Sequence, residues 1–235
     1  KGSSSKGIPA LEYFLFDEAG NNQNVLDSFL LSAYAQRNLD YMVALAENLE
    51  KNARKLDDLW SKSYAQEFSG NTATGLLSSE SLLLNALTSH IERVLNTKIG
   101  KPLGYVGING LDLSLLESKR SGESLHNIRN NLKLVKACFF GSYSDEGMPG
   151  LDDYLAYKIA QNGTQKNVVA EIKAQIETIQ KKLDQLPATF SEAVVSNEND
   201  LESLYEEWKV LLRLFKVDMA NELSVIITVS ENDGD

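Results

Sequence analysis

The sequence has few of the side chains that usually carry covalent or metal chemistry. It contains one cysteine, Cys138, and two histidines, His90 and His126, in 235 residues. One cysteine excludes an internal disulfide, and its apolar neighbours indicate a small buried hydrophobic residue. The two histidines lie too far apart in the sequence to form the paired imidazole ligands of a zinc-peptidase helix. We therefore expect neither a disulfide framework nor a histidine-based zinc centre.

Long apolar runs and an excess of positive charge are also missing. No segment approaches the roughly 18 apolar residues that a membrane-spanning helix needs, so we expect no such helix in this chain. The 33 acidic residues outnumber the 23 basic ones, which gives a formal net charge of −10. Phosphate backbones and anionic lipid repel a protein of this charge. Nucleic acid is therefore excluded as an expected partner.

What the sequence does have is helical periodicity over most of its length. Apolar residues recur at spacings of three and four, which predicts an all-α protein. The expected helices 124–140, 151–160, 165–186 and 198–220 are joined by short loops, which is typical of an up-and-down four-helix bundle. We expect its core to contain Leu132, Ile172, Ile176, Ile179, Leu204, Trp208 and Leu211.

A change of texture separates this bundle from the earlier part of the chain. Residues 98–110 contain four glycines and a proline, and such composition indicates a turn region. We therefore expect two helical-bundle halves: residues 1–110 as part of a first bundle, and 111–235 as a second four-helix bundle with a short extended C-terminal tail. Residues 1–100 supply too few helices for a closed bundle, so we expect an incomplete unit with exposed apolar surface.

The segment with the clearest chemical content is 7–16. Gly7 suits a turn, Pro9 suits the first turn of a helix, and the apolar residues that follow form one face. Glu12 lies among them, and its carboxylate must be exposed, paired or bound, because burying it alone is costly. A second polar block, 117–124, holds two acids, two bases and three serines ahead of a helix. It is either a capping cluster or part of a binding site.

These blocks, together with 97–104 and 233–235, resemble the imelysin-like family of the bacterial cell envelope, whose signature is G-x-H-x-x-E. In this chain the segment is Gly7-x-Pro9-x-x-Glu12, with proline where the family has histidine. The resemblance implies an all-α fold of two bundle-like halves, a portion upstream of Lys1, and export to the periplasm or attachment to the outer membrane as a lipoprotein. The family contains iron-regulated proteins and a peptidase that cleaves insulin.

Two hypotheses about function follow from the resemblance. Because proline has no side-chain donor, acceptor or metal ligand, the first is a non-catalytic envelope protein, linked to iron uptake, that binds a small ligand or a protein partner. The alternative is a metallopeptidase with a degenerate motif. We expect no catalytic or metal-ligating residues and no cofactor, although binding of iron or another divalent cation stays open. The expected binding cleft comprises Gly7, Pro9, Glu12, Arg37, Glu117, Ser118 and Ser121.

Overall fold

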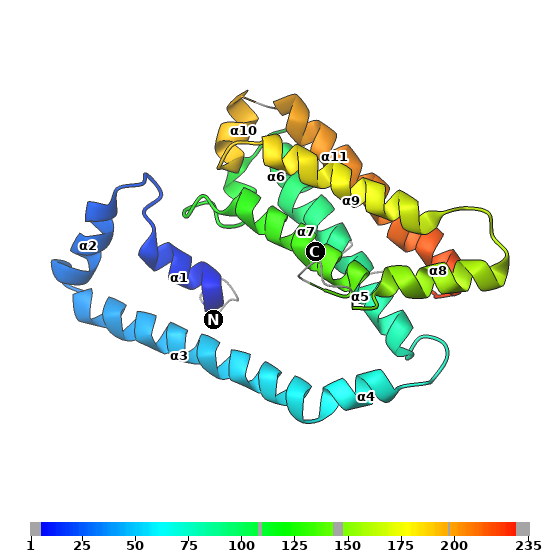
Figure 1. The fold of residues 1–235 in the computed structure, drawn as a ribbon. Helices are drawn as coiled ribbons and strands as arrows, with labels where there is room; N and C mark the ends of the chain where they lie inside the picture. The colour runs from blue at the N-terminus through cyan, green and yellow to red at the C-terminus, as the bar shows by residue number, and fades with distance from the viewer. Residues whose placement is uncertain (1–5, 108–109, 143–147, 197, 229–235) are drawn as a thin grey trace. The chain divides into compact units, whose positions relative to one another are not determined.

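The computed structural model describes residues 6–107, 110–142, 148–196 and 198–228. Within these ranges all regular structure is helical and no strand occurs, so the predicted all-α class is confirmed (Figure 1). The chain forms two compact units: Lys1–Asn71 with Ser118–Glu123, and Thr72–Glu117 with Ser124–Asp235. This division differs from the domain boundary expected near residue 110. Each unit is described separately below.

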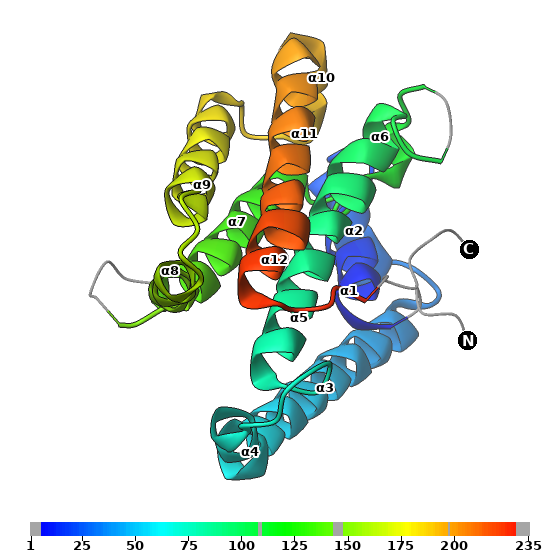
Figure 2. The same ribbon diagram turned by 90° about the vertical axis from the view of Figure 1, so that its right-hand side faces the viewer.

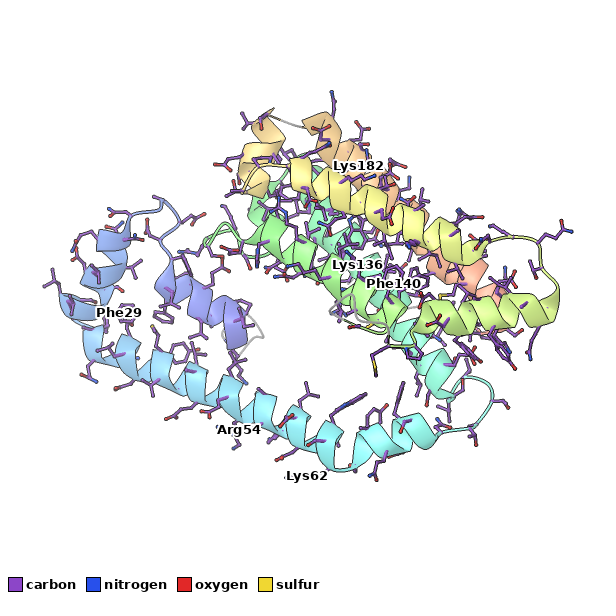
Figure 3. The ribbon with its side chains drawn as sticks, in the orientation of Figure 1. Phe29, Arg54, Lys62, Lys136, Phe140 and Lys182 are labelled. Carbon is purple, nitrogen blue, oxygen red and sulfur yellow. The ribbon has the colours of Figure 1, made fainter. Side chains whose placement is uncertain are left out.

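The first unit is a small group of helices around one long helix, α3. Helices α1 and α2 both pack against α3, with Phe14 of α1 placed between Phe29 of α2 and Tyr41 of α3 (Phe29 is labelled in Figure 3). Asn21 caps α2 by accepting the backbone N–H of Gln23. The elements are α1 (Gly7–Leu15), α2 (Asn22–Leu30), α3 (Ala35–Leu59), the π-helix η2 (Trp60–Tyr64) and α4 (Ala65–Gly70).

This unit buries very little apolar surface. Among its described residues, the buried hydrophobic side chains are Ala10 and Leu45. The apolar stripe of α3 continues beyond Leu45 through Leu49 and Leu56 to Trp60, yet Leu56 is 68% exposed and Trp60 is 51% exposed. Apolar surface of this kind, left in water, contributes nothing to stability. The exposed apolar surface agrees with the expectation for residues 1–100, although 72–100 belong to the other unit.

The second unit holds the main core. Its elements are α5 (Ser79–Arg93), the π-helix η3 (Val94–Gly100), α6 (Lys101–Leu103), the 3₁₀-helix η4 (Leu113–Leu115), α7 (Ser124–Phe140), α8 (Leu151–Asn162), α9 (Val168–Gln185), α10 (Phe190–Ser196), α11 (Glu198–Arg213), the π-helix η5 (Leu214–Met219) and α12 (Ala220–Leu223). Helices α9 and α11 pack side by side, and α7 and α5 pack against them (Figures 1 and 2).

The residues expected in this core are there. All seven that the periodicity predicted, from Leu132 to Leu211, are at most 1% exposed. The core also takes in α5 and η3, where Leu84, Ile91 and Ile99 are at most 1% exposed. Because these apolar residues face α11 and α7, the long helix before residue 110 packs with the second bundle. The short α8 instead packs on α7 and α12.

The turn region expected at 98–110 begins later than predicted. The helix that starts at Ser79 continues as η3 and α6 to Leu103. Pro102 lies directly after the π-helical turns of η3, near the end of this continuous helix, and its missing N–H removes one backbone donor there. Gly104, with φ of 76°, then ends the helix, and Tyr105 N–H donates to Gly100 O at 2.9 Å. This is the αL helix termination that glycine favours.

The same ending occurs a second time, after α12. Ser224 adopts φ of 55°, and Val225 N–H donates to Ala220 O at 2.9 Å. The chain then passes α5, where the Asn85 carboxamide accepts Thr228 N–H at 2.7 Å and donates to Ile226 O at 3.0 Å. These bonds hold the residues after α12 against α5 as far as Thr228.

Candidate functional site

The motif helix α1 begins as its sequence predicts. Gly7 has φ of 69°, a conformation that favours glycine, and Pro9 lies in the first turn, where its missing N–H leaves no hydrogen bond unmade. Ala10 is buried, whereas Pro9 is exposed. Glu12 follows one turn after Pro9 and is half-buried. The start of α1 therefore presents a proline ring where the family signature would present an imidazole.

The Glu12 carboxylate is bound by a serine that is far away in the sequence. One oxygen, Oε1, accepts the backbone N–H of Ser121 at 2.8 Å and the Ser121 hydroxyl at 2.9 Å. The two residues are 109 positions apart. Hydrogen bonds to a carboxylate are about twice as strong as neutral ones. The carboxylate thus acts as the acceptor that fixes the segment around Ser121.

That segment is a tightly bonded turn. Ser118 adopts φ of 56°, and its carbonyl accepts Gly122 N–H at 3.1 Å. The Ser121 hydroxyl also lies 3.2 Å from Ser118 O, but it has one proton to give. The shorter distance and the negative charge both favour Glu12 as the acceptor. A backbone φ in the left-handed region is unfavourable for serine. The hydrogen bonds around Ser118 therefore compensate for the strain at this residue.

Two basic residues of the same turn also bind the α1 end. Lys119 Nζ lies 2.8 Å from Glu18 Oε1, and this hydrogen bond is the main reason that the pKa of Glu18 is lowered. The Arg120 guanidinium lies 4.4 Å above the Tyr13 ring, a cation–π contact, and donates to Phe16 O at 3.3 Å. The turn is therefore held by α1 and the residues just after it, through the backbone, the hydroxyl and both cations of the turn.

The structure brings together some of the predicted cleft residues and not others. Gly7, Pro9 and Glu12 lie on α1, and Ser118 and Ser121 lie in the turn that Glu12 binds. Arg37 instead stacks 5.6 Å from the Tyr34 ring centre. Glu117 belongs to the second unit, where it pairs with Lys98 at 2.8 Å.

Sequence reasoning missed the roles of Tyr13 and Glu18 in holding this turn. Both residues lie within or just after the motif helix, but nothing in their spacing indicates a partner. The contacts they make join positions about a hundred residues apart in the sequence, from Glu18 to Lys119 and from Tyr13 to Arg120. The density of charge and hydroxyl groups in 117–124 was the available signal, and Ser121, which binds Glu12, lies in this block.

The described residues offer no ready metal site. They contain no group of three or more histidine, cysteine, aspartate or glutamate side chains placed to hold an ion. His90, on α5, has its pKa lowered, first by burial and then by the charge of Lys98. Burial also raises the pKa of the Cys138 thiol, which disfavours the nucleophilic thiolate. What the α1 site can do is hold a turn by hydrogen bonds and present the second Glu12 oxygen to a donor.

Comparison with known proteins places the chain in a family. In the part that the structure describes, none of the helices combines the length and the apolar character that a membrane crossing requires. No curated protein and no solved structure matches the chain. The family model described as imelysin, a peptidase family by name, matches residues 1–210. That match spans most of the sequence, including α1 and the turn that binds Glu12, and the chain therefore belongs to the imelysin family.

Proposed function

We propose that this protein is a non-catalytic ligand- or partner-binding protein of the bacterial cell envelope, linked to iron uptake. The observation that carries the proposal is at the family motif. Position 9 is a proline, and the motif carboxylate of Glu12 accepts two hydrogen bonds from Ser121 at 2.8 and 2.9 Å. The carboxylate thus has a binding role within the protein itself, and the side chain of Pro9, in the first turn, has no atom that could ligate a metal.

Zinc-dependent hydrolysis would demand more than this segment supplies. Catalytic zinc sites take three protein ligands and keep one position for water. The motif helix offers a single carboxylate, with one of its oxygens held by Ser121. Retaining Glu12 without the imidazole preserves the shape of the site through the turn 118–123. A site that keeps its shape but lacks metal-ligating side chains suits a protein that binds a partner without cleaving it.

The alternative function is an imelysin-type metallopeptidase with a degenerate motif. The family's peptidase name and the retained Gly7 and Glu12 favour it. It requires that a metal be held at Glu12 without the motif histidine. The two functions therefore differ in one measurable property, the metal dependence of peptide cleavage.

The test combines metal analysis with a peptide-cleavage assay. Purified protein is analysed for zinc and iron and then incubated with unfolded insulin chains, with and without chelator. We expect no stoichiometric zinc and no cleavage that chelator abolishes. Glu12→Gln should change neither result, and its amide oxygen still offers Ser121 an acceptor. Stoichiometric zinc, with cleavage lost both in chelator and in Glu12→Gln, would show that the protein is a peptidase.

A gain-of-ligand variant sharpens the comparison. Pro9→His returns the family imidazole to α1, and Pro9→Ala is its matched control, because both remove the ring but only one adds a ligand. If the proline is what removes metal binding, Pro9→His will retain more zinc or iron than Pro9→Ala. Equal, low metal content in both would assign the loss to the Ser121 bonds on Glu12.

The location and the link to iron are tested in cells. We expect the full-length protein in the periplasmic or outer-membrane fraction and its transcript to rise when iron is withheld. Recovery in the cytoplasmic fraction, with expression insensitive to iron, would contradict this part of the proposal. Titration of purified protein with ferrous or ferric iron by calorimetry would show whether the metal itself is a ligand.

A further inference from the structure

The end of α8 has an uncommon combination of residues. The helix ends at Asn162, and Gly163 follows with φ of 68° and open space where a side chain would be. At the αL helix ends after α6 and α12 the corresponding N–H donates a hydrogen bond, from Gly104 to Lys101 O at 3.0 Å and from Ser224 to Asn221 O at 3.1 Å. Among the described residues the Gly163 N–H has no such acceptor.

The Asn162 side chain connects α8 to α12. Its Nδ2 donates to the backbone oxygen of Glu222 at 3.0 Å and lies 3.3 Å from the Glu222 carboxylate. Thr164 adds a hydroxyl bond to the same carboxylate at 3.1 Å. Helices α8 and α12 pack directly on each other. The amide of Asn162 is therefore the donor that joins the ends of two helices.

We propose that Asn162–Gly163 is a site of spontaneous deamidation that breaks the connection between α8 and α12. The Gly163 backbone nitrogen, after losing its proton to solvent, attacks Cγ of Asn162. A C–N bond forms, the Cγ–Nδ2 bond breaks, and ammonia leaves, which gives a cyclic imide. Water then opens the imide at either carbonyl and yields aspartate or isoaspartate. Water is the one co-reactant, and no oxidant or reductant is involved.

Three features favour the reaction at this position. The attacking nitrogen has no hydrogen bond to break, Gly163 places no side chain over the attack path, and Asn162 is exposed at a helix end. Asn167, five residues later in the same connection, is also exposed, but it precedes the buried, β-branched Val168, and its side chain caps α9 by accepting Ala170 N–H. Asn167 is therefore an internal control.

The product changes the contact in two ways. A carboxylate at position 162 has no proton to donate, so both bonds to Glu222 are lost. In the aspartate product the negative charge stands where the Nδ2 atom stood, 3.3 Å from the Glu222 carboxylate. In isoaspartate the main chain instead runs through Cβ and Cγ, which displaces the end of α8, and the free carboxylate is the former backbone carbonyl. Like charges at this separation repel, even when partly exposed. We expect the end of α8 to separate from α12 in the deamidated molecule.

Peptide mapping by mass spectrometry tests the site. Purified protein is held in mildly alkaline buffer at body temperature, and the conversion of each asparagine is followed over weeks. We expect Asn162 to convert several-fold faster than Asn167, with isoaspartate as the main product. Asn162→Gln, which keeps the donor but closes the imide poorly, should show no conversion at this position. Equal conversion at Asn162 and Asn167 would overturn the assignment.

A second measurement tests the consequence. Asn162→Asp should raise hydrogen exchange in residues 159–163 and 220–223 several-fold and lower the midpoint of thermal unfolding. Combining it with Glu222→Gln removes the like-charge repulsion and should recover much of the loss. If Asn162→Asp exchanges like the original protein, the amide does not join the two helices, and that half of the proposal is wrong.

Discussion

Ser224 adopts a backbone conformation that suits glycine better than serine. Its φ of 55° lies in the left-handed region, which costs a residue with a Cβ about 1 kcal/mol or more. Ser224→Gly removes that cost, although the unfolded chain gains some entropy. We predict a net gain of up to about 1 kcal/mol in the free energy of unfolding, measured with urea.

Gly104, at the equivalent helix end, supplies the matched control. A Cβ there would lie 2.2 Å from the Gly110 carbonyl oxygen, and φ is already 76°. Gly104→Ala should therefore destabilise the protein while Ser224→Gly stabilises it. Two substitutions that shift stability in the same direction would contradict the argument from backbone conformation.

His90 makes a second residue-scale prediction, on acid stability. Its folded-state pKa is lowered, first by burial and then by the Lys98 charge, relative to an ordinary histidine near 6.5. The unfolded chain therefore takes up a proton at higher pH than the folded protein does. Stability contributed by neutral His90 is present above the ordinary histidine pKa and falls as the pH drops through it.

The measurement is the urea midpoint as a function of pH between neutrality and the range where carboxylates begin to titrate. His90→Gln should flatten this dependence, because it removes the titrating imidazole. An unchanged dependence in His90→Gln would show that the partly buried position of His90 is not the cause.

At the scale of elements, one arginine of α7 supports the end of α9. Arg129 Nη2 lies 2.9 Å from Leu183 O and 3.2 Å from both Leu186 O and Pro187 O. Leu183 lies in the last turn of α9, where its carbonyl also accepts Leu186 N–H at 3.3 Å, and Leu186 and Pro187 follow the helix end. Arg129→Ala should cost about 2 kcal/mol of unfolding free energy, because it leaves acceptors without a charged donor. Lys133→Ala, at an exposed position of the same helix, should cost far less in the same denaturation experiment.

The elements also show what local sequence could predict. The stripe from Val168 to Leu183 and the stop at Pro187 predicted α9 closely, since both the apolar period and the helix stop are local. The continuation of α5 through Pro102 was missed because it depends on π-turns, which have no strong composition signal. The expected helices 151–160 and 198–220 correspond to α8 and α11. The short helix α10, which lies between α9 and α11 in the sequence, was not predicted.

For the candidate site, too, local sequence predicted the local features and not the contacts between distant residues. Local sequence identified α1 and the serine block, because a carboxylate among apolar residues and a dense polar cluster are both unusual. It could not say which of the expected cleft residues would bind Glu12, because that depends on which residues meet after folding. The answer, Ser121, is a tertiary contact across 109 residues.

At the scale of the whole molecule, the two units differ greatly in how much they bury. Trp208 of the second unit is fully buried, whereas Trp60 of the first is 51% exposed. A unit with a small core opens at a lower free energy than one with a large core. We therefore predict that α1, α2 and α3 lose structure at lower urea concentration than α7, α9 and α11.

The two tryptophans make this measurable. In Trp60→Phe, fluorescence reports on Trp208 and therefore on the second unit. Far-ultraviolet circular dichroism reports on both units. We expect the circular dichroism transition to begin before the Trp208 transition, and hydrogen exchange to be fastest in residues 46–64. Coincident transitions by both probes would show that the two units unfold together.

The turn at 118–123 also has a consequence for how the molecule is made. It belongs to the first unit, while Glu117 and Ser124 on either side of it belong to the second. During synthesis the first helices leave the ribosome long before the serine that will bind Glu12. Closing that contact requires a loop of about a hundred residues, which slows folding. The earliest part of this chain is therefore expected to reach its final structure only after its middle has been translated.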